Sequence, residues 1–154
     1  EALALASLQS KATHASRHAE QCCQILTELL CQLLNGKPLP SALEQTRKRQ
    51  VNSEISTMMR RKIVEESEDD IQSDGYVINT LHTALWSTLT TDSFESAVLR
   101  ACNLGDDADT TAAVAGQIAG AMYGYSNIPQ DLKVGLMDER KLYVTSQFFS
   151  HKAE

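Results

Sequence analysis

The chain has 154 residues, of which 42% are hydrophobic and 22% charged, and its formal net charge is −6. This size and balance are typical of one globular domain that buries a core, and they exclude a disordered or fibrous chain. The negative charge argues against general binding of nucleic acid, which requires a basic surface. No apolar run approaches the roughly 20 residues that a membrane span needs, so we expect no membrane insertion.

Helical periodicity begins near the start of the chain. Residues 2–11 fit the last turns of a helix. Apolar residues then recur at three- and four-residue steps over residues 19–34, which predicts an amphipathic helix with Ser16 as its N-cap. The pair Asn35-Gly36 is expected to stop this helix.

The four cysteines are Cys22, Cys23, Cys31 and Cys102, and they show no CxxC spacing. This disfavours a zinc site and favours reduced thiols, as in a cytoplasmic protein. Cys23 and Cys31 are separated by roughly two helical turns, so we expect both to face a core.

The middle of the chain is more polar. Pro38 and Pro40 are expected to prevent the preceding helix from restarting, and residues 41–50 then predict a short polar helix. Residues 51–68 place apolar positions amid charge and predict no definite element. The acid-rich run EESEDDIQSDG, residues 65–75, predicts a loop.

The second half of the chain predicts further helices joined by short turns. Residues 77–89 and 94–102 each show an apolar face, and Asp92 or Ser93 is expected to cap the second of these helices. Another helix is predicted over residues 112–123, followed by two short carboxy-terminal helices. No convincing period-two alternation indicates a strand. The predicted fold class is therefore all-α.

An acidic loop, NLGDDADTT at residues 103–111, precedes the predicted helix 112–123. One interpretation is capping, because Asp and Thr oxygens accept hydrogen bonds from the free amides of a first turn. One aspartate satisfies that need, and repulsion among Asp106, Asp107 and Asp109 would oppose folding unless a cation lies among them. Carboxylates with a hydroxyl suit Mg²⁺, Mn²⁺ or Ca²⁺. The residues alone leave capping and metal binding as open alternatives.

The helix after this loop carries Gly116, Gly120 and Gly124 at four-residue steps, with alanines between them. Small side chains let another helix approach closely. We therefore expect a tightly packed central helix that holds the acidic loop rigidly.

Three segments carry a resemblance to a known family: SKATHASRHAEQC (residues 10–22), GYVINTLHTALWSTLTTDSFESAVLRACNLG (75–105) and NLGDDADTTAAVAGQIAGAMYG (103–124). In content and order they are similar to the ADP-ribosylglycohydrolases, which include the dinitrogenase-reductase-activating glycohydrolase and the ADP-ribosylarginine and ADP-ribosylserine hydrolases. The resemblance implies an all-helical domain with two adjacent divalent cations, Mg²⁺ or Mn²⁺, in a central cleft. It implies that Asp107, Asp109 and Thr110 are metal ligands; Asp106 stands where many members have Gly and is not assigned.

The resemblance also implies the substrate-binding residues. His14 and Tyr76 match positions that line the ADP-ribose pocket, and Gly75 and Gly105 are expected to approach the ligand through their backbone. A structural histidine that ties two helices together is the alternative for His14. The implied reaction is hydrolysis of the glycosidic bond between ADP-ribose and a protein side chain or small molecule, by metal-activated water at the anomeric carbon.

The amino-terminal part of the family pattern has no counterpart here. That part carries a GDALG-like stretch and a Thr-Asp-Asp-Thr cluster, which supply the remaining metal ligands and a catalytic acidic residue. Asp69-Asp70 lacks the flanking threonines, and the chain begins with Glu instead of Met. We therefore expect residues 1–154 to be the C-terminal portion of a single domain. It would be inactive by itself and would have the N-terminal half of the same protein as its partner.

Two other interpretations stay open. A non-catalytic relative would bind ADP-ribose or serve as a crystallin-like structural protein, although the intact Asp107, Asp109 and Thr110 weigh against it. The other alternative is a simple helix bundle in which the aspartates only cap a helix and whose role is to bind a partner. The sequence does not distinguish an arginine linkage from a serine linkage.

Overall fold

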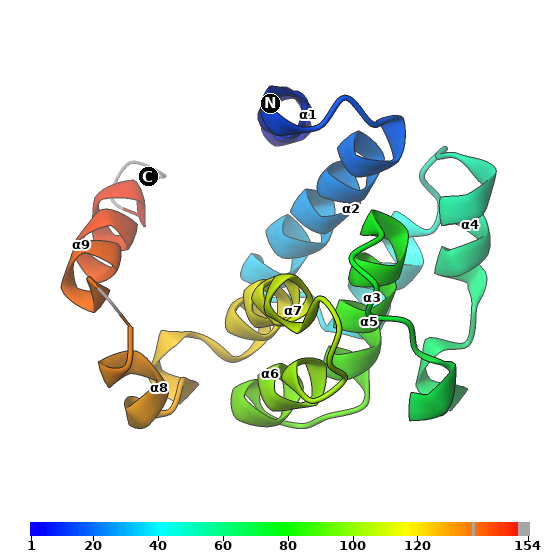
Figure 1. Ribbon diagram of the computed structural model, residues 1–154. Helices are drawn as coiled ribbons and strands as arrows, with labels where there is room; N and C mark the ends of the chain where they lie inside the picture. Colours follow the sequence, from blue (N-terminus) through cyan, green and yellow to red (C-terminus); the bar gives the residue numbers. More distant parts are fainter. Residues whose placement is uncertain (137, 151–154) are drawn as a thin grey trace.

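The computed structural model describes residues 1–136 and 138–150, and within these residues it contains helices and no strand (Figure 1). The all-α prediction is confirmed. In chain order the elements are α1 (Ala2–Thr13), α2 (Arg17–Leu34), α3 (Leu39–Thr46), α4 (Ser53–Arg60), the 3₁₀ turns η1 (Ile63–Glu65) and η2 (Glu68–Asp70), α5 (Val77–Leu89), α6 (Phe94–Cys102), α7 (Ala108–Tyr123), the 3₁₀ turn η3 (Tyr125–Asn127), α8 (Gln130–Val134) and α9 (Glu139–Ser150).

Helix α5 lies at the centre of the bundle, and α2, α6 and α7 pack around it (Figure 1). Its buried residues include polar ones such as Ser87 and Thr88. Ser87 Oγ donates to the Thr83 carbonyl at 2.8 Å, and Thr88 Oγ1 donates to the Ala84 carbonyl at 2.9 Å. Because the helix itself satisfies these hydroxyls, α5 can be buried along most of its length.

Gly116 and Gly120 of α7 face α6, as the pattern of small residues predicts. A Cβ added to Gly116 would lie 3.8 Å from Val98 Cγ2, and one added to Gly120 would lie 3.9 Å from Phe94 Cε2. These are ordinary packing distances, so side chains of α6 fill the space beside the glycines. Helix α7 is therefore a packed core helix with the acidic loop at its amino-terminal end.

The predicted starts and stops of two helices are confirmed. Ser16 Oγ accepts a hydrogen bond from the Ala19 amide at 3.4 Å at the start of α2. Gly36 follows the end of α2 with a φ of +78°, a conformation that glycine adopts without strain. At the start of α6, Ser93 rather than Asp92 forms the cap, in a reciprocal capping box with Ser96.

Two helix starts differ from the sequence prediction. Helix α3 begins at Leu39 and includes Pro40 in its first turn, so the expectation that Pro40 prevents a restart is wrong. The first amides of a helix have no intrahelical partner, so proline removes nothing there. Helix α7 begins at Ala108 instead of residue 112, which places Asp109 and Thr110 inside its first turn.

The cysteine prediction is wrong for Cys31, which is exposed. The buried stripe of α2 runs through Cys22, Ile25, Leu29 and Leu33, one residue out of phase with Cys23. Burial raises the pKa of the Cys22 thiol to about 12. Cys22 therefore behaves as a core residue that stays protonated at neutral pH.

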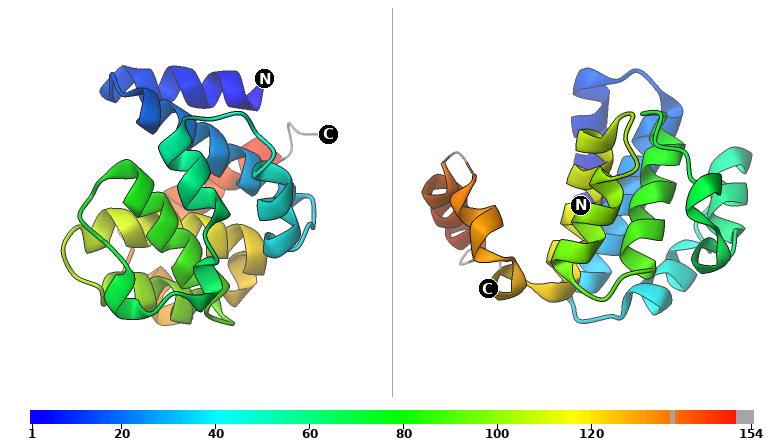
Figure 2. Two further views of the ribbon diagram at one scale, coloured as in Figure 1. Left: turned by 90° about the vertical axis from the view of Figure 1, so that its right-hand side faces the viewer. Right: turned by 60° about the horizontal axis from the view of Figure 1, so that its bottom comes forward.

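Helices α8 and α9 lie to one side of the bundle formed by α1–α7, and the chain reaches them through η3 (Figure 2). Within residues 1–136 and 138–150, no helix is both long and apolar enough to cross a membrane.

His82 on α5 is buried beside a carboxylate and a guanidinium group. Its side chain is 4% exposed, and its Nε2 lies 3.1 Å from Glu66 Oε2, which also contacts Arg61 Nη2 at 2.8 Å. Burial lowers the pKa of His82 below its usual 6.5, the nearby Arg61 lowers it further, and Glu66 opposes both. Below about pH 6.5 the unfolded chain therefore takes up a proton that the folded chain excludes.

We expect the free energy of unfolding to fall as the pH drops from 7.5 to 5.5, by at most about 1.4 kcal/mol per pH unit from this one group. Urea denaturation at several pH values measures the change. H82Q keeps a polar side chain without an imidazole and should flatten the pH profile over this range. An unchanged slope in H82Q would assign the acid sensitivity to other groups.

Candidate metal and substrate site

The acidic loop is fixed to a second loop that precedes α5. The Asp107 amide donates to the Ser73 carbonyl at 2.8 Å, and Ser73 Oγ lies 3.2 Å from Thr111 Oγ1. Ser73 and Thr111 are both buried. Residues 73–76 and the start of α7 therefore form one rigid corner of the bundle, although they are distant in sequence.

Asp107 occupies the N-cap position of α7, but its side chain makes no capping hydrogen bond. Its Oδ1 instead accepts a hydrogen bond from Thr110 Oγ1 at 2.9 Å. The capping interpretation therefore does not account for the Asp107 carboxylate. The positive end of the α7 dipole lies beside this carboxylate and favours negative charge there.

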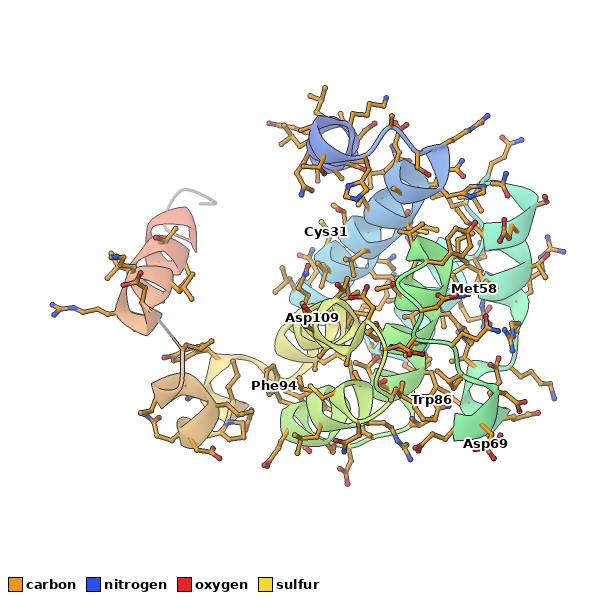
Figure 3. All side chains as sticks on the ribbon, in the orientation of Figure 1. Cys31, Met58, Asp69, Trp86, Phe94 and Asp109 are labelled. Atoms are coloured by element: carbon orange, nitrogen blue, oxygen red, sulfur yellow. The ribbon has the colours of Figure 1, made fainter. Side chains whose placement is uncertain are left out.

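The three residues that the family resemblance assigns as ligands lie together at the start of α7. Asp107 is half-buried, and Asp109 and Thr110 are exposed in the first turn. Figure 3 shows Asp109 at this end of the helix. Two carboxylates and a hydroxyl are hard oxygen donors that suit Mg²⁺ or Mn²⁺. Within the described part of the chain, no group of three or more His, Cys, Asp or Glu side chains is placed to hold a metal.

Gly75 lies against the Asp107 carboxylate. A Cβ added to Gly75 would be 2.6 Å from Asp107 Oδ2, and the φ of Gly75 is +76°. Both the close approach and the left-handed backbone require glycine at this position. Gly105 also has a positive φ, +78°, but an added Cβ would meet nothing within 4 Å, so the space beside its backbone is open.

The loop before α5 is held by Asp74, which the sequence prediction missed. Asp74 Oδ1 accepts hydrogen bonds from the Tyr76 amide at 3.0 Å and from Asn79 Nδ2 at 3.1 Å. The Tyr76 amide, and then the Asn79 side chain, lower the pKa of the Asp74 carboxyl. In this common turn, an Asp side chain accepts a hydrogen bond from the backbone amide two residues later. An Asp before Gly75 and Tyr76 is therefore a sequence signal that could have predicted the role of Asp74.

The two histidines around the start of α2 have different surroundings. His14 is exposed after α1, and its Nδ1 lies 2.8 Å from Oγ1 of the neighbouring Thr13. The residue that meets Tyr76 is His18, whose Nδ1 lies 2.9 Å from Tyr76 Oη. The assignment of His14 to the ADP-ribose pocket stays a prediction. The sequence did not single out His18, because nothing in the local pattern shows that the first turn of α2 faces the loop before α5.

Comparison with known proteins identifies the family of this chain. A protein-family model described as ADP-ribosylglycohydrolase matches residues 1–152. The chain belongs to the ADP-ribosylglycohydrolase family. A solved structure titled "ADP-ribosylglycohydrolase-related protein complex" superposes with a TM-score of 0.82 and 33% identity, over 90% of this chain and 49% of that chain.

Curated members of the ADP-ribosylglycohydrolase family are also similar in sequence. ADP-ribosylarginine hydrolase Tri1 of Serratia proteamaculans is 39% identical over 141 residues, which cover 87% of this chain and 36% of that protein. The Tri1 protein of Pseudomonas putida is 40% identical over 123 residues, covering 80% and 33%. The ADP-ribosyl-[dinitrogen reductase] glycohydrolase of Rhodospirillum rubrum is 29% identical over 127 residues, covering 79% and 38%. The chain thus spans about a third of the length of these relatives.

Proposed function

We propose that this chain forms the Asp107 side of the active site of an ADP-ribosylglycohydrolase that releases ADP-ribose from arginine side chains. Family membership supports the reaction class, and two similar proteins named ADP-ribosylarginine hydrolases favour the arginine linkage. The structural observation that carries the proposal is the Asp107 carboxylate, which caps no amide, accepts a hydrogen bond from Thr110 and lies beside Gly75.

In the proposed reaction, water attacks the anomeric carbon of the ribose. Positive charge builds on the sugar ring as the bond to the arginine nitrogen breaks, and that nitrogen leaves with a proton. Asp107, Asp109 and Thr110 would hold one or both of two divalent cations, Mg²⁺ or Mn²⁺. A bound divalent cation polarises ribose hydroxyls and water.

The other residues of the site position the substrate. Tyr76 and His14 would line the ADP-ribose pocket, and the backbones of Gly75 and Gly105 would lie close to the ligand. We assign no catalytic acid or base among residues 1–154. We propose that this acidic residue and the remaining metal ligands lie in a further part of the enzyme, since the aligned segments cover only 36%, 33% and 38% of the three similar proteins.

The test is hydrolysis by the longest natural polypeptide that contains residues 1–154. With Mg²⁺ or Mn²⁺ present it should release ADP-ribose from an ADP-ribosylarginine peptide, and EDTA should abolish the release. An ADP-ribosylserine peptide is the matched control for the linkage. Calorimetry should also detect binding of ADP-ribose. Binding without hydrolysis of either peptide would contradict the enzyme proposal and support a non-catalytic ADP-ribose-binding relative.

A further inference from the structure

The side chain of Tyr76 lies where three elements meet. Tyr76 itself precedes α5, His18 is in the first turn of α2, and Glu54 is in the first turn of α4. His18 Nδ1 is 2.9 Å from Tyr76 Oη, and the two rings meet edge to face with centroids 6.3 Å apart and planes at 75°. The phenol is therefore held by a side chain from a helix that is remote in sequence.

The carboxylate of Glu54 indicates which group donates in the hydrogen bond between His18 and Tyr76. Partial burial raises the pKa of the Tyr76 phenol, and Glu54 raises it further, so the phenol stays neutral. A carboxylate only accepts hydrogen bonds, so we infer that the Tyr76 hydroxyl is oriented toward Glu54 and away from His18. With the hydroxyl oriented in this way, the phenol oxygen accepts from His18, which requires a proton on Nδ1.

The backbone of Tyr76 is fixed as well. Its amide donates to Asp74 Oδ1 at 3.0 Å, and its carbonyl accepts from the Thr80 amide at 2.8 Å. The residue nevertheless keeps 39% of its surface exposed, directly after the Gly75 that lies against Asp107. An aromatic ring fixed at both ends loses little conformational freedom when a ligand contacts its open surface.

We propose that His18 is a positioning residue for the substrate: it holds the Tyr76 ring so that the exposed surface of the ring contacts the ADP-ribosyl group. This inference rests on the proposed function. It assigns to His18 a role in substrate affinity and none in bond cleavage.

A double-mutant cycle on the longest natural polypeptide containing residues 1–154 tests the role of His18. Calorimetry with ADP-ribose and Mn²⁺, and steady-state kinetics with the ADP-ribosylarginine peptide, are compared for H18A, H18N, Y76F and H18A/Y76F. Losing one such hydrogen bond should raise Kd and KM about three- to tenfold, with kcat changed by less than about twofold. H18N places an amide nitrogen near the position of Nδ1 and should recover most of the affinity. In the Y76F background, H18A should raise Kd and KM by less than about twofold, because the hydroxyl that His18 contacts is already absent.

A second readout needs no variant. A long-range proton–nitrogen NMR spectrum of His18 at pH 8 should show the proton on Nδ1, and a proton on Nε2 would contradict the assigned hydrogen-bond direction. Unchanged Kd and KM in H18A, or effects of H18A and Y76F that add independently, would overturn the positioning role while the wild type still binds ADP-ribose. A wild type that neither binds ADP-ribose nor hydrolyses the peptide would instead refute the proposed function, and the inference with it.

Discussion

G75A is expected to displace the Asp107 carboxylate and to weaken Mn²⁺ binding by about tenfold to a hundredfold, the range found when a group that orients a metal ligand is lost. The added methyl group would lie 2.6 Å from Asp107 Oδ2, well inside contact distance. Because the φ of Gly75 is +76°, alanine also adds about 1–2 kcal/mol of backbone strain. Calorimetric titration with Mn²⁺ and urea denaturation measure the two effects.

Gly36 offers a matched control for the backbone strain. Its φ is +78°, nearly that of Gly75, but an added Cβ would meet nothing within 4 Å. G36A should therefore lower stability by a similar strain energy and leave Mn²⁺ affinity unchanged. If G75A and G36A affected Mn²⁺ binding equally, the contact between Gly75 and Asp107 would have no role in shaping the site.

D107N is expected to abolish stabilisation by metal without harming the fold. The amide oxygen that D107N introduces can still accept from Thr110 Oγ1, but the variant loses one of the two carboxylates assigned as ligands. It relieves repulsion among the clustered aspartates but loses the favourable interaction of the Asp107 charge with the α7 dipole, so the metal-free variant should melt close to the metal-free wild type. Wild type in Mn²⁺ at about 100 times Kd should gain about 2.7 kcal/mol, and D107N should gain almost none.

D106N separates the effect of a metal ligand from that of general charge. Asp106 is exposed, has a φ of +51° that asparagine also tolerates, and is not assigned as a ligand. Differential scanning calorimetry with and without Mn²⁺ should show D106N retaining most of the metal-induced shift. Equal losses in D106N and D107N would indicate that the acidic loop attracts cations only through its total charge.

Much of the fold follows from patterns that act within one turn of helix. Ser16 and Ser93 cap their helices, and Gly36 follows the end of α2, because these signals depend on neighbouring backbone groups alone. The same signals are ambiguous where a helix starts without a side-chain cap. This ambiguity explains why the sequence prediction placed the starts of α3 and α7 too late.

The candidate site also combines features that the sequence indicates with contacts that only the fold creates. The all-helical class and the family resemblance were readable from the sequence, because helical periodicity and motif order lie along the chain. One helical turn also brings Asp107, Asp109 and Thr110 together at the start of α7, and their role as metal ligands stays a prediction. The contact of Gly75 with Asp107 and the contact of His18 with Tyr76 are visible only in the folded chain. Those contacts join segments from different helices, and their distances depend on how α2, α5 and α7 pack, which no local spacing of residues encodes.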